Sequence, residues 1–287
     1  MLMATLGELC FLSINIANKR LRNANVKAAS ILAIYSLTLP VWAILSVYLY
    51  FTQTVTITAP YLILLGIWTG VNFIHNFGFI TLHRYQSLSE STAFAFAFTF
   101  LGALLVDVFV FQIEFHWPTL IGIFLTFIGG LLHVISRKGL IPSHLHIHTG
   151  KKLIIIVALC AFTIIMTTTY KQTILMQQNQ MFHIAFSHTF LFMLFGALGT
   201  KAFISDASHL KIPISYILLI FVFLIIAVIT ASYAIAGLPL TYLVLFTLLK
   251  SFLYLVHDIW TKELKMDIKN ISACGLIISG VIVINIF

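Results

Sequence analysis

Two charged residues of this sequence lie near the middle of apolar runs. Lys250 stands near the middle of the run 238–256, and Glu8 stands halfway along the run 2–17. If these runs cross a bilayer, a charge at the centre costs about 2.5–3.5 kcal/mol on insertion scales, so it needs a reason. The lysine could bind an anionic group or pair with the glutamate, and the glutamate could carry a proton. The simpler alternatives are a lysine that snorkels to the membrane surface and a glutamate that reaches the headgroups.

A polar stripe on one predicted helix, residues 61–82, is a second candidate site. Its members are Trp68, Asn72, His75 and Asn76. Their spacing places them on one helical face. A one-sided polar stripe in lipid predicts a cavity that binds a polar substrate, and His75 is also a candidate for proton coupling. The alternative is hydrogen bonding between helices, worth about 0.6–2 kcal/mol per contact.

Further polar residues lie late in predicted helices. Asp107, His257 and Asp258 could form a gate, although such residues are more often wet groups at the membrane surface. Tyr233 could offer its hydroxyl to a substrate, and its alternative place is the aromatic belt of the membrane surface.

The tract His144-Leu145-His146-Ile147-His148 resembles a small metal-binding sequence. Because no carboxylate or thiol neighbours it, we predict no bound metal. Divalent metal-ion transport, which would use the membrane histidine of the run 61–82 and these loop histidines, is the alternative function. The sequence contains no nucleophile elbow, phosphate loop or pair of catalytic carboxylates. It therefore predicts neither an enzyme nor a cofactor.

The elements that must position these residues are membrane helices. Hydrophobic residues make up 61% of the chain and charged residues 8%, and the mean hydropathy is +1.07. Too few polar residues remain to cover a soluble domain, so lipid must be the solvent. A crossing needs about 20 apolar residues, and ten such runs can be drawn; Pro40 should kink the second, 28–51. We predict an all-α, multi-pass protein of the cell membrane, the inner membrane of a bacterium.

Basic residues concentrate in the odd-numbered connections between the predicted helices. The first connection holds Lys19, Arg20, Arg22 and Lys27, whereas the even-numbered connections hold only Lys171. By the positive-inside rule, the odd connections face the cytoplasm and both termini lie outside. The net charge of +8 is explained by these helix ends, so we predict no nucleic-acid partner.

The plan of the chain repeats after about 150 residues. An apolar run 92–111, a short break and a second run return as the run 238–256, a break and a final run. Phe100 in the first copy becomes Lys250 in the second. Five crossings in each half require two halves that are inverted relative to each other. We predict a first five-helix repeat over 1–136, a histidine-containing linker over 137–152 and a second repeat over 153–287.

A family resemblance rests on two breaks that carry a glutamate, each followed by a helix with small residues. The residues are Glu114 with Gly122 and Gly129, and Glu263 with Ala273, Gly275 and Gly280. This pattern resembles the drug/metabolite transporter superfamily, particularly its EamA-type ten-helix members. The resemblance implies ten helices in two inverted repeats and secondary transport by alternating access. It also implies both termini inside, against the charge count. The proline often found in the fourth and ninth helices is missing from the first run and stands at the start of the second, as Pro239.

We therefore expect a secondary transporter that moves a small polar or anionic metabolite. Lys250 would contact an anionic group, the polar stripe and Tyr233 would bind polar groups, and Glu8 or His75 could couple protons. The identity of the substrate, the direction of transport and the oligomeric state, a homodimer included, are left open.

Overall fold

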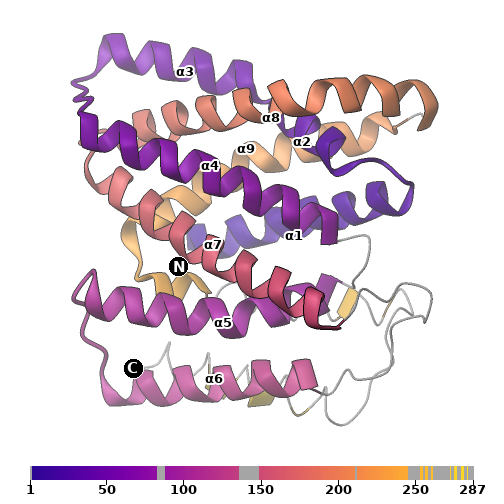
Figure 1. Ribbon diagram of the computed structural model, residues 1–287. Coiled ribbons are helices and arrows are strands. Elements are labelled where there is room, and N and C mark those ends of the chain that lie inside the picture. Colours follow the sequence, from indigo (N-terminus) through magenta and orange to yellow (C-terminus); the bar gives the residue numbers. More distant parts are fainter. Residues whose placement is uncertain are drawn as a thin grey trace. The chain divides into compact units, whose positions relative to one another are not determined.

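The computed structural model describes residues 2–82, 88–135, 149–210 and 212–244, together with single positions between residues 253 and 283. Within these residues the chain forms helices and no strand (Figure 1). The helices are α1 (Leu2–Asn23), α2 (Ala28–Ser36), α3 (Leu39–Thr52), α4 (Ala59–Leu82), α5 (Leu88–Phe109), α6 (Trp117–Ile135), α7 (Thr149–Leu175), α8 (Gln180–Leu210) and α9 (Ile214–Gly237). The prediction of an all-helical fold is confirmed.

Four stretches of the described chain have the length and composition of membrane spans. They are Ala28–Thr52, Ala59–Leu82, Gln180–His209 and Ile214–Gly237. The membrane character predicted from composition is therefore supported, whereas ten crossings and an inverted repeat stay predictions.

The chain divides into two compact units. Unit 1 contains Met1–Arg84 and Ile165–Leu238, and unit 2 contains Tyr85–Ile164 and Pro239–Phe287. Each unit combines chain from both predicted halves. The predicted halves divide the sequence rather than the folded structure, and they remain a prediction. Helix α7 begins at Thr149, inside the predicted linker.

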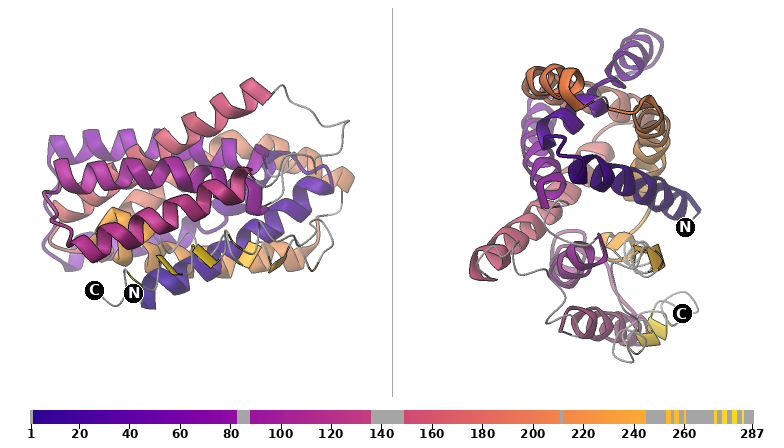
Figure 2. Two further views of the ribbon diagram at one scale, coloured as in Figure 1. Left: turned by 90° about the horizontal axis from the view of Figure 1, so that it is seen from below. Right: turned by 90° about the vertical axis from the view of Figure 1, so that its right-hand side faces the viewer.

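Unit 1 is built on close contacts between its helices. In Figures 1 and 2, α1 packs along α9, and α2 and α3 pack along α8. Gly199 of α8 lies so near to α2 that an added Cβ would meet the carbonyl oxygen of Ala29 at 2.4 Å. Only a glycine therefore allows this approach of the two backbones.

Pro40 divides the second predicted run. The run becomes α2 and α3, separated by Leu37 and Thr38, with the proline in the first turn of α3. Proline has no N–H group and is tolerated there, but it would break a hydrogen bond in a helix interior. The predicted kink is confirmed, and α3 places Trp42 in the interior, where none of its side chain is exposed.

One end of unit 1 is charged. The carboxylate of Asp206 near the end of α8 accepts hydrogen bonds from the Lys27 backbone N–H and the Ser30 hydroxyl, both at 2.7 Å, and lies 3.3 Å from the Lys27 ammonium. Arg20 donates to the hydroxyl of Tyr216 at the start of α9. The connection after α1 and the connection between α8 and α9 therefore meet at this end.

At the opposite end of unit 1, two connecting segments are held together by a hydrogen bond between uncharged groups. The amide of Gln177, in the turn before α8, donates to the Thr56 carbonyl oxygen at 2.7 Å. The segment between α3 and α4 therefore meets the turn between α7 and α8.

Unit 2 contains α5 and α6, which pack side by side (Figure 1). Phe100 and Ile123 form the centre of its small core. Gly280 packs directly on α6, since an added Cβ would lie 2.5 Å from the Gly122 carbonyl oxygen. Two of the small residues that carry the family resemblance are thus in close contact.

Candidate functional site

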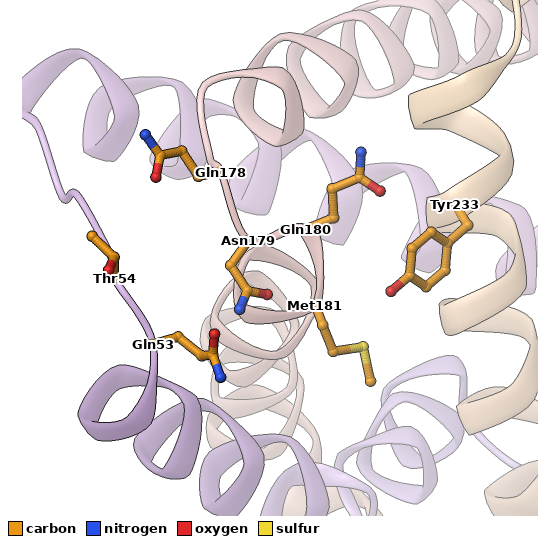
Figure 3. Close-up of a pocket in the computed structure, with 7 residues that line it drawn as sticks. All are labelled: Gln53, Thr54, Gln178, Asn179, Gln180, Met181 and Tyr233. Carbon is orange, nitrogen blue, oxygen red and sulfur yellow. The ribbon is translucent and has the colours of Figure 1, made fainter.

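Unit 1 holds a polar pocket of about 490 Å³ at its neutral end. The lining comes from the segment after α3, the turn into α8 and the last part of α9 (Figure 3). Its residues are Gln53, Thr54, Gln178, Asn179, Gln180, Met181 and Tyr233. Amides and hydroxyls dominate this lining, and none of these side chains is charged. Such groups donate and accept hydrogen bonds without selecting for charge.

The wall of the pocket between α7 and α8 is fixed by local hydrogen bonds. Asn179 accepts a hydrogen bond from the Phe182 backbone N–H at 2.9 Å, which caps the start of α8. The hydrogen bond from Gln177 to Thr56 ties the same turn to the opposite wall. These two hydrogen bonds therefore fix the shape of the turn.

Buried polar side chains continue inward from this end of the unit. The hydroxyl of Tyr61 in α4 lies 2.9 Å from Nδ1 of His183, and the hydroxyl of Thr173 in α7 lies 3.4 Å from its Nε2. The hydroxyl of Tyr170 lies 2.8 Å from that of Ser232, the residue next to Tyr233 of the pocket. Four helices thus supply one connected region of polar groups, whose side chains are at most 2% exposed.

A second histidine of α8, His188, lies deeper and is enclosed by aromatic rings. Its ring centroid is 5.6 Å from Trp42, 5.2 Å from Trp68, 5.9 Å from Tyr170 and 5.7 Å from Phe192. These four rings are called the His188 cage below. Nδ1 of His188 lies 2.8 Å from the Ile184 carbonyl oxygen of its own helix. Since a carbonyl only accepts, this nitrogen donates.

The polar stripe predicted on α4 is divided by the structure. Trp68 is 3% exposed and belongs to the His188 cage, and Asn72 is also buried. The amide of Asn76 donates to the Asn72 carbonyl oxygen at 2.9 Å and to its side-chain oxygen, so part of the stripe bonds within its own helix. His75 is half-buried, with its ring 5.4 Å from that of Phe79. Only Trp68 reaches the cage.

The other predicted residues are spread over both units. Tyr233 lines the pocket, and Glu8 is half-buried on α1. In unit 2, the fully buried carboxylate of Asp107 accepts hydrogen bonds from the backbone N–H groups of Leu240 and Thr241 at 3.0 and 2.6 Å. It therefore caps the start of a helix. His257 is half-buried, and a gate formed with Asp107 stays a prediction.

Some predictions fall outside the described residues. Lys250, Asp258 and the histidines 144, 146 and 148 belong to this part of the chain. Among the residues that the structure describes, no group of three or more histidine, cysteine, aspartate or glutamate side chains could hold a metal ion. Metal-ion transport through membrane and loop histidines stays untested.

The two histidines of α8 were not selected from the sequence. They are five residues apart and do not share a helical face, so they form no stripe with each other. The available signal was their position in a predicted membrane helix, where ionisable residues mark functional sites. In the folded chain Tyr170 lies close to both histidines: its ring centroid is 4.8 Å from that of His183 and 5.9 Å from that of His188.

No protein-family model and no curated protein matches this chain. Among solved structures, one crystal structure aligns with 99% of this chain and 96% of its own length, with a TM-score of 0.65 and 11% identity. At 11% identity this similarity shows a shared fold and gives no information about function.

Proposed function

We propose that this protein is a secondary transporter of the drug/metabolite type, which moves a small polar or anionic metabolite by alternating access. The observation that carries the proposal is the pocket at one end of unit 1, together with the buried polar groups between its helices. Polar groups inside the membrane are costly, and in membrane proteins they mark the paths of substrates and ions. A region of histidine and tyrosine side chains beneath an open pocket has the composition of such a path.

The plan of the sequence supports the inverted repeat. By sequence position, α1 corresponds to α7 and α4 corresponds to α9. In unit 1, α1 packs closely along α9, whereas α7 meets α4 less extensively, through Trp68 and Tyr170, whose ring centroids lie 4.8 Å apart. In transporters built from inverted repeats, the interface of the repeats is where substrate binds.

The charge difference between the two ends of unit 1 supports a direction in the membrane. Arg20, Arg22 and Lys27 gather at one end, and exposed Lys201 lies late in α8 toward the same end. The pocket lies at the opposite end, where Lys171 is the one basic residue that the sequence places in a connection. By the positive-inside rule, the pocket opens away from the cytoplasm of a bacterial inner membrane, and both termini lie outside.

The pocket favours uncharged polar groups of a substrate, because amide and hydroxyl side chains line it. Binding of an anionic group is assigned to Lys250. Replacement of Lys250 by Met should abolish uptake of an anionic substrate into proteoliposomes, because no ammonium remains to offset the buried charge. Unchanged uptake of an anion would reject this role for Lys250.

Uptake from a uniformly ¹³C-labelled extract of polar metabolites tests the proposal while the substrate is still unidentified. Proteoliposomes should accumulate at least one labelled compound above protein-free liposomes, as read by mass spectrometry. Replacement of Gln180 by Leu should reduce that uptake, whereas replacement of exposed His209 by Gln should not. If no compound enters while circular dichroism shows folded helices, the transport proposal is wrong.

A further inference from the structure

We propose that His188 is the proton-binding residue of the transport cycle, and that the aromatic rings of its cage hold the imidazolium inside the membrane. This inference rests on the proposed transport function. It transfers the coupling role from Glu8 and His75, which the sequence suggested, to a residue that the sequence did not single out.

The hydrogen bonds of His188 leave one nitrogen available for a proton. Nδ1 is 2.8 Å from the Ile184 carbonyl oxygen and 3.2 Å from the Ser187 hydroxyl. Nε2 has no hydrogen-bond partner among the described residues. In the neutral ring the proton therefore resides on Nδ1, and the lone pair of Nε2 accepts a second proton to give the imidazolium. Release of the same proton restores the starting state, so the step is balanced and breaks no other bond.

The cage suits a cation. A positive group is attracted to an aromatic face within about 6 Å of the ring centroid, and tryptophan attracts it best. All four rings of the cage lie within that range of the imidazole, and two of them are tryptophans. The rings come from α3, α4, α7 and α8, so a change in their packing would change how well the cation is held. A helix rearrangement during transport would thus alter proton affinity.

His183 is suited to a different role. Tyr61 and Thr173 occupy its two ring nitrogens, and two tyrosine rings lie close to it at 5.7 and 4.8 Å. It acts as a positioning residue that fixes Tyr61 and the cage residue Tyr170. The titratable groups near His188 are then His183 on α8, Tyr170 on α7 and, beyond His183, Tyr61 on α4. Among the described residues, no charged side chain forms a hydrogen bond or ion pair with His188.

The depth of His188 agrees with a coupling role. It follows the first residue of α8 by eight positions, which is about 12 Å along a helix. The residue therefore lies well inside the span Gln180–His209 and about two turns from the pocket end. A proton at this depth crosses part of the membrane when the site changes access.

Tryptophan fluorescence of the purified protein tests protonation without a substrate. A protonated imidazole quenches a neighbouring indole, and two of the four tryptophans, Trp42 and Trp68, lie against His188. Trp117 and Trp260 are 79% and 84% exposed and follow His116 and His257 in the chain, so both are replaced by phenylalanine in the background protein for this test. Acidification should then remove much of the remaining emission in one step. His188→Gln should abolish the step, and His209→Gln, an exposed histidine of the same helix, should retain it.

Two further variants keep the test decisive if His188→Gln does not fold. Trp42→Phe and Trp68→Phe each leave one reporter beside His188, and each should keep a smaller quenching step. A background protein with no quenching step overturns the proposal. A step that persists in folded His188→Gln, or one that His183→Gln abolishes while His188→Gln does not, also overturns it.

Uptake from the labelled extract separates this inference from the transport proposal. An inward acid gradient should raise accumulation in wild type, and His188→Gln should lose this gain while it keeps exchange at equal pH. If uptake occurs and its response to the gradient survives in His188→Gln, the inference fails and transport stands. If fluorescence shows the His188 step but no compound enters, the transport proposal fails and the proton site stands.

Discussion

At the scale of single residues, the site depends on hydrogen bonds between buried groups of different helices. Tyr61 pairs with His183, and Tyr170 pairs with Ser232. A buried polar group without a partner costs about 1–3 kcal/mol of stability. Removal of one member of a pair therefore destabilises the fold, because the other member stays buried without its hydrogen bond. In membranes, measured contacts of this kind average about 0.6 kcal/mol, because the unfolded state also finds partners. Tyr61 and His183 are both fully buried, so the stabilisation by their hydrogen bond should lie at the upper end of the range for such contacts.

Replacement of Tyr61 by Phe should therefore destabilise the protein by about 1–2 kcal/mol. The phenylalanine keeps the ring contacts and removes only the hydroxyl that lies against His183 Nδ1. A lower midpoint of thermal unfolding in detergent is the expected result. The matched control is Tyr48→Phe, which removes a hydroxyl from a side chain that is 60% exposed. Equal midpoints for the two variants would show that the Tyr61 hydroxyl contributes nothing.

The residue scale is also where sequence reasoning was least complete. Spacing on one helix identified Trp68 and Asn72, because a stripe is visible along a single element. It did not identify Trp42, Tyr170 or His188, because the cage takes its rings from four helices. Helical periodicity gives the face of one helix but not the partner that this face meets. Only the packing shows that Trp68 and His188 touch.

At the scale of elements, the sequence was more informative. Apolar runs located the spans, and the proline of the second run located a break. α8 runs from Gln180 to Leu210 and extends beyond its apolar part, since the polar residues near its ends continue the backbone hydrogen bonds. What the runs could not give is the distance between helices. Gly199 sets that distance for α2 and α8, and nothing in its own run distinguishes it from other glycines.

Replacement of Gly199 by Ala should lower stability by about 1–3 kcal/mol, the usual cost of an added group in a packed interface. The new Cβ would lie 2.4 Å from the Ala29 carbonyl oxygen and 2.9 Å from the Ala33 nitrogen. These are backbone atoms, so no side chain can rotate away, and the two helices must separate.

The control for Gly199 is Gly66→Ala on α4. An added Cβ there meets nothing within 4 Å, and alanine has the better helix propensity. Unfolding midpoints should fall for Gly199→Ala and remain level or rise for Gly66→Ala. A Gly199→Ala variant as stable as the wild type would show that α2 and α8 are not this close.

At the scale of the whole molecule, the sequence predicts a repeated plan, and the residues of the candidate site are distributed unequally between its two halves. The repeat and the positive-inside count come from sequence, and both treat the halves as alike. The candidate site depends on where the halves differ, since Trp68 lies on α4 whereas His183 and His188 both lie on α8. Because the charge count and the family resemblance give opposite sidedness, the orientation needs its own experiment.

Cysteine accessibility decides the orientation. Ala24 lies at the charged end of unit 1 and Thr56 at the neutral end, and both side chains are exposed. In a background whose three native cysteines are replaced by alanine, Thr56→Cys should react with a membrane-impermeant maleimide on intact cells. Ala24→Cys should react only after permeabilisation, because Arg20, Arg22 and Lys27 hold its connection in the cytoplasm. The reverse pattern would place both termini inside, as the family resemblance implies, and the pocket would then open to the cytoplasm. Reaction of both cysteines on intact cells would contradict the assignment of the two connections to opposite sides of a membrane.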